Sequence, residues 1–248
     1  MKKNIAVILT IILIVTSVVW TSRKQVRRIA SCVISQQNQS VTITPSTIPC
    51  AYSIDQLSCY HDVQNKKYSV IMFGNSMVSR GNWNELLNRD DVGNFGIAGD
   101  GIACINKRKS PLANSGARIW FIEGGINDLQ TMSEDSICAQ YREIISFVQQ
   151  QQAVPIIVPV FYVSSNAGSH VDGREEYKEV NTIIEKLNRR LGDIVRETGA
   201  ELLDMNPQFA DDNHILREEF TTDGIHLSDR AYRLWGEEIV RVLKKFGV

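Results

Sequence analysis

The chain of 248 residues lacks an excess of charge of either sign. Its 27 Lys and Arg residues nearly balance its 28 Asp and Glu residues, so the formal net charge is −1. A nucleic-acid-binding domain usually carries clustered positive charge on one face. The balance therefore argues against a nucleic-acid partner and favours a small, weakly charged ligand.

The sequence also lacks the cysteine patterns that bind structural metals. None of its cysteines lies in a C-x-x-C pair or beside histidines at zinc-finger spacing, so no metal site is expected. Cys50 and Cys59 are close enough to close a small loop in an oxidising compartment, and two unpaired thiols are the alternative. The five cysteines are Cys32, Cys50, Cys59, Cys104 and Cys138. Their odd number leaves at least one thiol free or paired with another chain.

A cleavage site of the A-x-A kind is missing from the N-terminal region. Between Lys3 and Arg23 lie 19 uncharged, mostly apolar residues, close to the roughly 20 that span a bilayer core. Residues 29–32 resemble a lipoprotein processing box, but basic residues separate them from the apolar stretch. Residues 1–28 are therefore predicted to form an uncleaved signal-anchor, a transmembrane helix.

The orientation of this anchor rests on opposing signals. More Lys and Arg follow the apolar stretch than precede it, which alone would place the rest of the chain in the cytoplasm. The start at Lys2 and Lys3 resembles a signal sequence, and the cysteine usage suits an oxidising compartment. We expect a membrane-anchored domain that is extracytoplasmic, either periplasmic or at the cell surface.

Residues 29–66 are rich in Ser, Thr, Gln and Asn, which is typical of a stalk or linker. From residue 67 onward, short apolar runs alternate with amphipathic segments. Strands are expected at 68–73, 92–95, 118–122, 154–162 and 201–204. Helices are expected at 77–88 with an interruption at Gly81, at 134–151, at 175–198 and from Ser228 to 245. The two prolines in 154–162 suggest an edge-like or irregular strand.

This alternation predicts an α/β fold in which helices cover both faces of a mostly parallel sheet, a three-layer α/β/α sandwich. No internal repeat is visible in the sequence. Ligands of such sheets bind beyond the carboxyl ends of the strands. Polar, glycine-bearing clusters occur after the predicted strands, at 74–77, 94–100 and 124–128, and in a late loop at 223–226.

These clusters contain the groups that serine hydrolases need. Ser76 can supply a nucleophilic hydroxyl, His226 a base and Asp223 a carboxylate that orients the imidazole ring. The backbone N–H groups of Ser76 and Gly99 and the side-chain amide of Asn127 are candidates for an oxyanion hole. Asp128 is expected to support the loop that holds Asn127.

Four sequence blocks together resemble the SGNH/GDSL hydrolase family. They are G-x-S at Ser76, N-x-G-x-x-G-D around Gly99, G-x-N-D at Asn127, and D-x-x-H ending at His226. The resemblance covers about residues 68–248. It implies a flavodoxin-like, five-stranded parallel sheet of order 2-1-3-4-5 and ester hydrolysis through an acyl-serine intermediate, with no cofactor. Asn75 departs from the family, which usually has Asp there, and we expect this change to tune the loop without loss of activity.

The remaining histidines, His61, His170 and His214, lack a carboxylate partner at metal-ligand spacing and are expected at the surface or in the core. Residues 162–170 are a candidate substrate rim.

Several functions remain open at this level. The favoured hypothesis is hydrolysis of a small ester, an O-acetyl group on a carbohydrate. The alternatives are a lipase or thioesterase that acts on acyl chains, an O-acyltransferase to a glycan, and a catalytically inactive glycan-binding module. The sequence does not determine the oligomeric state.

Overall fold

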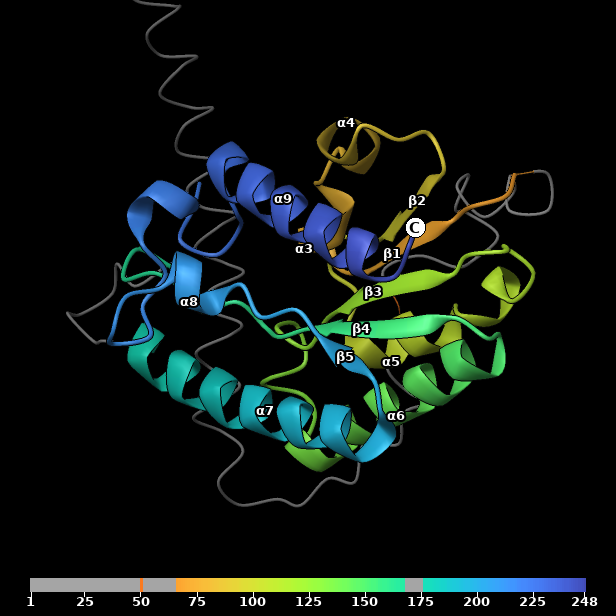
Figure 1. Cartoon of the computed structure of the whole chain (residues 1–248). Coiled ribbons are helices and arrows are strands. Elements are labelled where there is room, and N and C mark those ends of the chain that lie inside the picture. Colours follow the sequence, from red (N-terminus) through yellow and green to blue (C-terminus); the bar gives the residue numbers. More distant parts are fainter. Residues whose placement is uncertain (1–49, 51–65, 168–175) are drawn as a thin grey trace, which may run out of the picture. The chain divides into compact units, whose positions relative to one another are not determined.

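Five parallel strands form the centre of the fold, in the order β2-β1-β3-β4-β5 (Figure 1). The computed structural model describes residue 50, residues 66–167 and residues 176–248. The strands are β1 (Val70–Gly74), β2 (Val92–Gly96), β3 (Ile119–Glu123), β4 (Val154–Val158) and β5 (Glu201–Leu202). This sheet and its order confirm the predicted flavodoxin-like α/β fold.

Helices cover both faces of the sheet (Figure 1). One face packs against α5 (Ile102–Lys107), α6 (Glu134–Gln150) and α7 (Glu176–Thr198). The other packs against α3 (Ser76–Ser79), α4 (Trp83–Leu87) and α9 (Asp229–Lys245). The short elements are η3 (Ser110–Leu112), α8 (Asn206–Phe209) and η4 (Glu218–Phe220).

The two cores follow from the alternation of side chains along each strand. In β1, Ile71 and Phe73 belong to the core beneath α5, α6 and α7. Val70 and Met72 belong to the core beneath α3, α4 and α9. Because both faces are covered, all five residues of β1 are buried, which explains the continuous apolar run in the sequence.

The expected helix at 77–88 with an interruption at Gly81 is present as two helices, α3 and α4, which are separated at Gly81. The helix ends at Arg80 and the chain resumes helical geometry at Trp83. This break lets the indole Nε1 of Trp83 donate to the carbonyl oxygen of Val78 at 2.8 Å. The same ring packs edge-on against Trp235 of α9, with centroids 4.8 Å apart.

The prediction of an edge-like strand at 154–162 is wrong, because β4 pairs with both β3 and β5 and so lies inside the sheet. Val154 donates its N–H toward β3, to Arg118, so the next backbone nitrogen faces the β5 side. That nitrogen belongs to Pro155, and pairing with β5 begins only at Ile156. The missing N–H of Pro155 therefore costs no ladder hydrogen bond.

Ser228 takes the N-cap position before α9, although its side chain does not cap the helix. The hydroxyl donates instead to the carbonyl oxygen of Glu219 at 2.8 Å.

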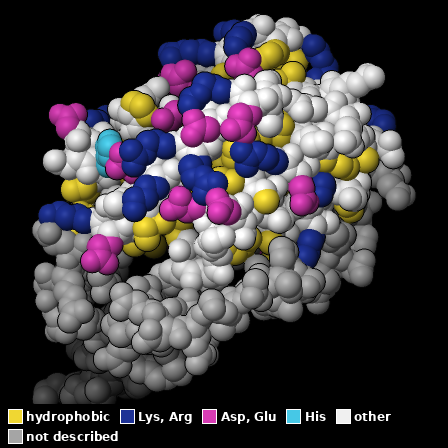
Figure 2. Space-filling model, turned by 90° about the horizontal axis from the view of Figure 1, so that it is seen from below, with side chains coloured by type: hydrophobic (Ala, Val, Ile, Leu, Met, Phe, Trp, Pro, Cys, Tyr) yellow, Lys and Arg dark blue, Asp and Glu magenta, His cyan; other side chains and the backbone are white. Residues whose placement is uncertain are grey.

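The face that carries α6 and α7 mixes basic and acidic side chains (Figure 2). Ion pairs join the two helices, with Arg142 2.6 Å from Glu197 and Arg190 2.5 Å from Asp135. These pairs are solvent-exposed, so each contributes at most about 1 kcal/mol to stability.

The predicted anchor at 1–28 and nearly all of the predicted stalk at 29–66 lie outside the described residues. Within the described ranges, no helix combines the length and apolar character that crossing a bilayer requires.

Cys50 forms a disulfide with Cys104 of α5, across 54 positions of sequence. The considered pairing of Cys50 with Cys59 is therefore wrong, since short sequence separation did not decide the partner. Cys138 is buried and has a free thiol. The disulfide ties Cys50 to the helix that follows Gly99.

Removing this disulfide should destabilise the protein. Closing a loop of this length stabilises a fold by about 4 kcal/mol in the chain-entropy model, so Cys50→Ala should lower the free energy of unfolding by up to that amount. Urea unfolding followed by fluorescence measures the change. A reductant should weaken the wild type and leave Cys50→Ala unaffected, and equal stability of the two proteins without reductant would contradict the pairing.

Candidate active site

The turn that presents Ser76 lies directly after β1, at the carboxyl edge of the sheet. A Cβ on Gly74 would lie 2.5 Å from the backbone oxygen of Glu123, so only glycine allows β1 and β3 to approach so closely here. Asn75 then caps α3, because its side-chain oxygen accepts the N–H of Met77 at 2.8 Å. The first helical residue is Ser76, which is 8% exposed.

A chain of hydrogen bonds joins Ser76 to the late loop of the sequence. The Oγ of Ser76 lies 3.1 Å from Nε2 of His226. The other ring nitrogen, Nδ1, lies 2.7 Å from Oδ2 of Asp223. The structure thus brings together the three residues that the sequence predicted to act as a triad. This arrangement can move a proton from the hydroxyl to the ring while the carboxylate stabilises the charged imidazole.

Hydrogen bonds within the late loop fix the position of the His226 ring. The carbonyl oxygen of His226 accepts from the Thr221 hydroxyl at 2.8 Å and from the Thr222 N–H at 2.9 Å. The Gly224 carbonyl oxygen accepts the N–H of Ser164 at 2.8 Å, which ties the loop to the segment after β4. The imidazole therefore approaches Ser76 from a braced loop.

The acidity of Asp223 suits the role of an orienting anion. Partial burial alone would raise its pKa, but hydrogen bonds from the backbone N–H of His226, its ring and the N–H of Ile225 outweigh burial and lower the pKa. Its Oδ1 accepts the backbone N–H of His226 at 2.7 Å. The carboxylate is therefore ionised at neutral pH.

Gly99 and Asn127 lie in loops that neighbour the Ser76 turn. Gly99 has a φ of +85°, which favours glycine. The Ile97 N–H donates to the Gly74 carbonyl oxygen at 3.0 Å, which joins the Gly99 loop to the nucleophile turn. The Asn127 amide donates to the Asp100 carbonyl oxygen at 2.9 Å. An amide NH₂ has two donors, so the second N–H of Asn127 can serve a substrate oxygen.

Asp128 supports the same loop from the other side. Its carboxylate accepts the N–H of Ile102, the first residue of α5, at 2.8 Å. Burial, and secondarily the charge of Asp100, raise the pKa of Asp128 to about 6. Asn127 and Asp128 therefore both form hydrogen bonds with the segment that follows Gly99.

Arg108, which sequence reasoning missed, joins three parts of the site. Its buried guanidinium donates to Oδ2 of Asp100 at 2.8 Å and to the carbonyl oxygens of Phe95 and Gly74 at 2.6 Å each. It therefore connects β2, the Gly99 loop and the nucleophile turn. Only a guanidinium offers several donors in a fixed planar arrangement that can reach all three.

Glu123, also missed, lies beneath the nucleophile turn at the end of β3. It is 1% exposed, and burial raises its pKa to about 8, although hydrogen bonds from Asn75 oppose that rise. The Asn75 amide donates to Oε1 of Glu123 at 3.5 Å. Among the described residues, Oε2 has no hydrogen-bond partner.

The contact with Glu123 accounts for Asn75 where the family usually has Asp. An aspartate here would place a second carboxyl group against buried Glu123, and like charges in a buried site disfavour ionisation of both. The neutral amide caps α3 and donates to Glu123 at once.

His214 and Tyr162 lie apart from the triad contacts. Their rings stack with centroids 4.9 Å apart, and His214 is half exposed, with Nδ1 3.6 Å from Glu185. Glu185 is far from His214 in sequence and not at metal-ligand spacing, and the exposure of His214 agrees with the expected surface position. His61 and His170 lie outside the described residues. Within the part of the chain that the structure describes, no group of three His, Cys, Asp or Glu side chains is placed to hold a metal ion.

Replacing Glu123 with Gln should make stability less sensitive to alkaline pH. The folded state keeps the Glu123 proton to about pH 8, whereas the unfolded chain releases it near its ordinary pKa of 4.5. The contribution of Glu123 to the free energy of unfolding is therefore fully present below about pH 4.5 and is lost as the pH rises toward 8. Because Gln cannot ionise, the stability of Glu123→Gln relative to wild type should increase by several kcal/mol across that window.

Urea unfolding of both proteins at about pH 5, 7 and 8.5 measures this difference. A difference in unfolding free energy that stays constant with pH would show that Glu123 is ionised in the fold.

Comparisons with known proteins identify the family and the fold. The family model described as GDSL-like lipase/acylhydrolase matches residues 72–234, from β1 into α9. A search of curated proteins finds no match.

Solved structures share the fold at low sequence identity. A protein from Streptococcus pneumonia, provisionally assigned as platelet activating factor, has a TM-score of 0.64 and 19% identity, over 76% of this chain and 88% of that one. A GDSL-like lipase from Bacteroides thetaiotaomicron has a TM-score of 0.61 and 18% identity, over 71% and 87%. An acetylxylan esterase from Geobacillus stearothermophilus has a TM-score of 0.55 and 15% identity, over 71% and 94%.

The family match spans most of the domain and includes all the residues of the proposed triad and oxyanion hole. It confirms the resemblance drawn from the four sequence blocks. The chain belongs to the GDSL-like lipase/acylhydrolase family and is a hydrolase of ester bonds.

Proposed function

We propose that the chain removes an O-acetyl group from a carbohydrate through an acyl-serine intermediate on Ser76. The observation that carries this proposal is the continuous hydrogen-bond chain from the Ser76 hydroxyl through His226 to Asp223. Each heavy-atom distance lies within the range over which proton transfer is direct.

In the acylation step, Nε2 of His226 takes the hydroxyl proton as Oγ of Ser76 attacks the ester carbonyl carbon. The tetrahedral intermediate places negative charge on the former carbonyl oxygen. The N–H groups of Ser76 and Gly99 and the second amide proton of Asn127 are its donors. His226 then gives its proton to the leaving alcohol, and the acyl-serine remains.

Deacylation repeats these transfers with water. His226 removes a proton from water, the hydroxide oxygen attacks the acyl carbon, and the proton returns to Oγ of Ser76 as the carboxylic acid leaves. Asp223, ionised through neutral pH, stabilises the imidazolium in both steps. The enzyme therefore needs no cofactor for this cycle.

A polar substrate is favoured by the surface of the described residues. Leu202 on β5, 42% exposed, is the one large hydrophobic side chain that they expose. Enzymes that bind acyl chains at a lipid surface usually present a contiguous apolar patch. The acetylxylan esterase from Geobacillus stearothermophilus, similar in fold, supports an acetyl group on a sugar as the ester.

Kinetics with wild type and variants test the chemistry. Ser76→Ala should lower kcat/KM for p-nitrophenyl acetate by at least about 10⁴-fold, and Asn127→Ala by about 10²- to 10³-fold because one oxyanion donor is lost. Matching circular dichroism and unfolding curves serve as the folding control. Undiminished turnover by Ser76→Ala would refute the nucleophile.

The ester preference follows from the same assay. Wild type should prefer p-nitrophenyl acetate to the octanoate and should release acetate from acetylated oligosaccharides. A preference for octanoate would favour a lipase or thioesterase. Transfer of acetyl to an added acceptor sugar would favour an acyltransferase, and lack of all turnover would favour an inactive glycan-binding module.

The proposed location is outside the cytoplasm, with residues 1–28 as a signal-anchor and residues 29–66 as a stalk. The Cys50–Cys104 disulfide supports this location, because disulfides persist mainly in oxidising compartments. The substrate would then be a cell-surface or exported carbohydrate.

Protease added to intact cells or spheroplasts tests this location. The domain should be digested without detergent, while a cytoplasmic marker protein stays intact. Alkylation under denaturing conditions should leave Cys50 and Cys104 unmodified until a reductant is added. Protection of the domain until lysis would place it inside the cell.

A further inference from the structure

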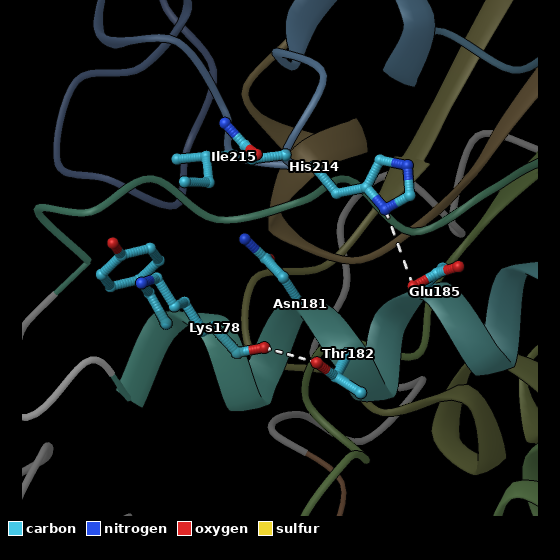
Figure 3. Close-up of a pocket in the computed structure, with 8 residues that line it drawn as sticks. Lys178, Asn181, Thr182, Glu185, His214 and Ile215 are labelled. Atoms are coloured by element: carbon cyan, nitrogen blue, oxygen red, sulfur yellow. Dashed lines mark hydrogen bonds and ion pairs between the residues drawn. The ribbon is translucent and has the colours of Figure 1, made fainter.

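A pocket of about 480 Å³ lies between α7 and the loop that precedes η4 (Figure 3). We infer that it binds a sugar unit of the carbohydrate whose ester is cleaved at Ser76, an inference that rests on the proposed function. The pocket would hold part of the substrate that lies beyond the scissile acetyl group.

The helical side of the pocket comes from residues four apart in sequence. Tyr177, Asn181 and Glu185 recur at this spacing, so they lie along one face of α7. Figure 3 shows Lys178, Asn181, Thr182 and Glu185 along α7, below His214 and Ile215. Side chains on neighbouring turns therefore line a continuous wall of the pocket.

The opposite wall is held rigidly by hydrogen bonds and stacking. Oδ1 of Asp211 accepts the N–H groups of Asn213 and Ile215 at 2.9 Å each. His214 lies between them with a φ of +59°, a conformation that few residues other than glycine adopt. Its ring stacks on Tyr162 with an interplanar angle of 3° and lies 3.6 Å from Glu185. The imidazole is thus fixed at the rim of the pocket.

One short segment separates this pocket from the catalytic loop. The Asn181 side chain accepts the N–H of Val163 at 2.8 Å and donates to its carbonyl oxygen at 2.9 Å. The next residue, Ser164, donates its N–H to Gly224, which follows Asp223 directly. Asn181 of the pocket and Gly224 of the catalytic loop therefore hold neighbouring residues of one buried segment, so the pocket lies one segment away from the triad.

The chemistry of the lining suits a neutral polyol. Lys178 and Glu185 contribute opposite charges, so the pocket favours neither an anion nor a cation. Hydroxyl, amide, ammonium and carboxylate groups offer both donors and acceptors to sugar hydroxyls. The rings of Tyr177 and His214 offer flat surfaces with polar ends.

Two substrates with wild type and matched variants test the pocket. His214→Asn removes the ring but tolerates the left-handed backbone, since Asn is enriched there. Lys178→Gln removes an exposed charge that lines the pocket, and Lys186→Gln removes an exposed charge of α7 that does not line it. The readout is the ratio of kcat/KM for acetylated oligomers of xylose or N-acetylglucosamine to that for p-nitrophenyl acetate.

This ratio should fall about 10-fold in His214→Asn and about 3- to 10-fold in Lys178→Gln, mainly through KM for the oligomer, and stay within about 2-fold in Lys186→Gln. An unchanged ratio in His214→Asn and Lys178→Gln would overturn the pocket assignment. If wild type cleaves p-nitrophenyl acetate but no acetylated oligomer, the carbohydrate substrate itself fails and the pocket assignment falls with it.

Discussion

The hydrogen bond between Oγ of Ser76 and Nε2 of His226 joins segments 150 residues apart in the sequence. Its 3.1 Å length requires that the end of β1 and the loop before α9 be held in one relative position. Packing of α9 supplies that constraint: the Tyr232 hydroxyl donates to the carbonyl oxygen of Met77 at 2.7 Å, and Trp235 packs against Trp83 of α4. The hydrophobic core above the sheet therefore sets the geometry of the proposed triad.

Buried polar groups beneath the site also hold its loops in position, and their burial lowers the stability of the fold. A buried ion pair such as Arg108 with Asp100 often contributes little net stability, because desolvation offsets the attraction. Its value here is positional, since the guanidinium also holds the carbonyl oxygens of Gly74 and Phe95. Glu123 likewise keeps a proton at neutral pH so that it can lie buried against Asn75.

Much of the fold followed from local sequence patterns. Apolar runs located every strand, the helical spacing located α6, α7 and α9, and the four sequence blocks indicated the strand order. The residues brought together at Ser76 were also predicted, because their types and order are specific even though each block alone is weak. The roles of these residues in catalysis remain predictions.

Long-range polar contacts were not predictable in this way. Arg108 follows a short helix with no strong periodicity, and its partners come from the ends of β1 and β2 and from the Gly99 loop. Glu123 lies one residue past the apolar run of its strand, where a carboxylate is normally expected to reach solvent. The disulfide of Cys50 joins it to a residue 54 positions away, so sequence distance did not indicate its partner. The edge-like strand was predicted wrongly from Pro155, because a proline is tolerated inside the sheet when pairing with β5 begins only after it.

The most direct test of the central claim is covalent labelling of the native protein with a fluorophosphonate, followed by peptide mass spectrometry. A hydroxyl activated by His226 should carry the label at Ser76, and His226→Ala should slow labelling by at least about 10²-fold while leaving the fold intact. Labelling at residues other than Ser76, or labelling that is equally fast in His226→Ala, would contradict the account.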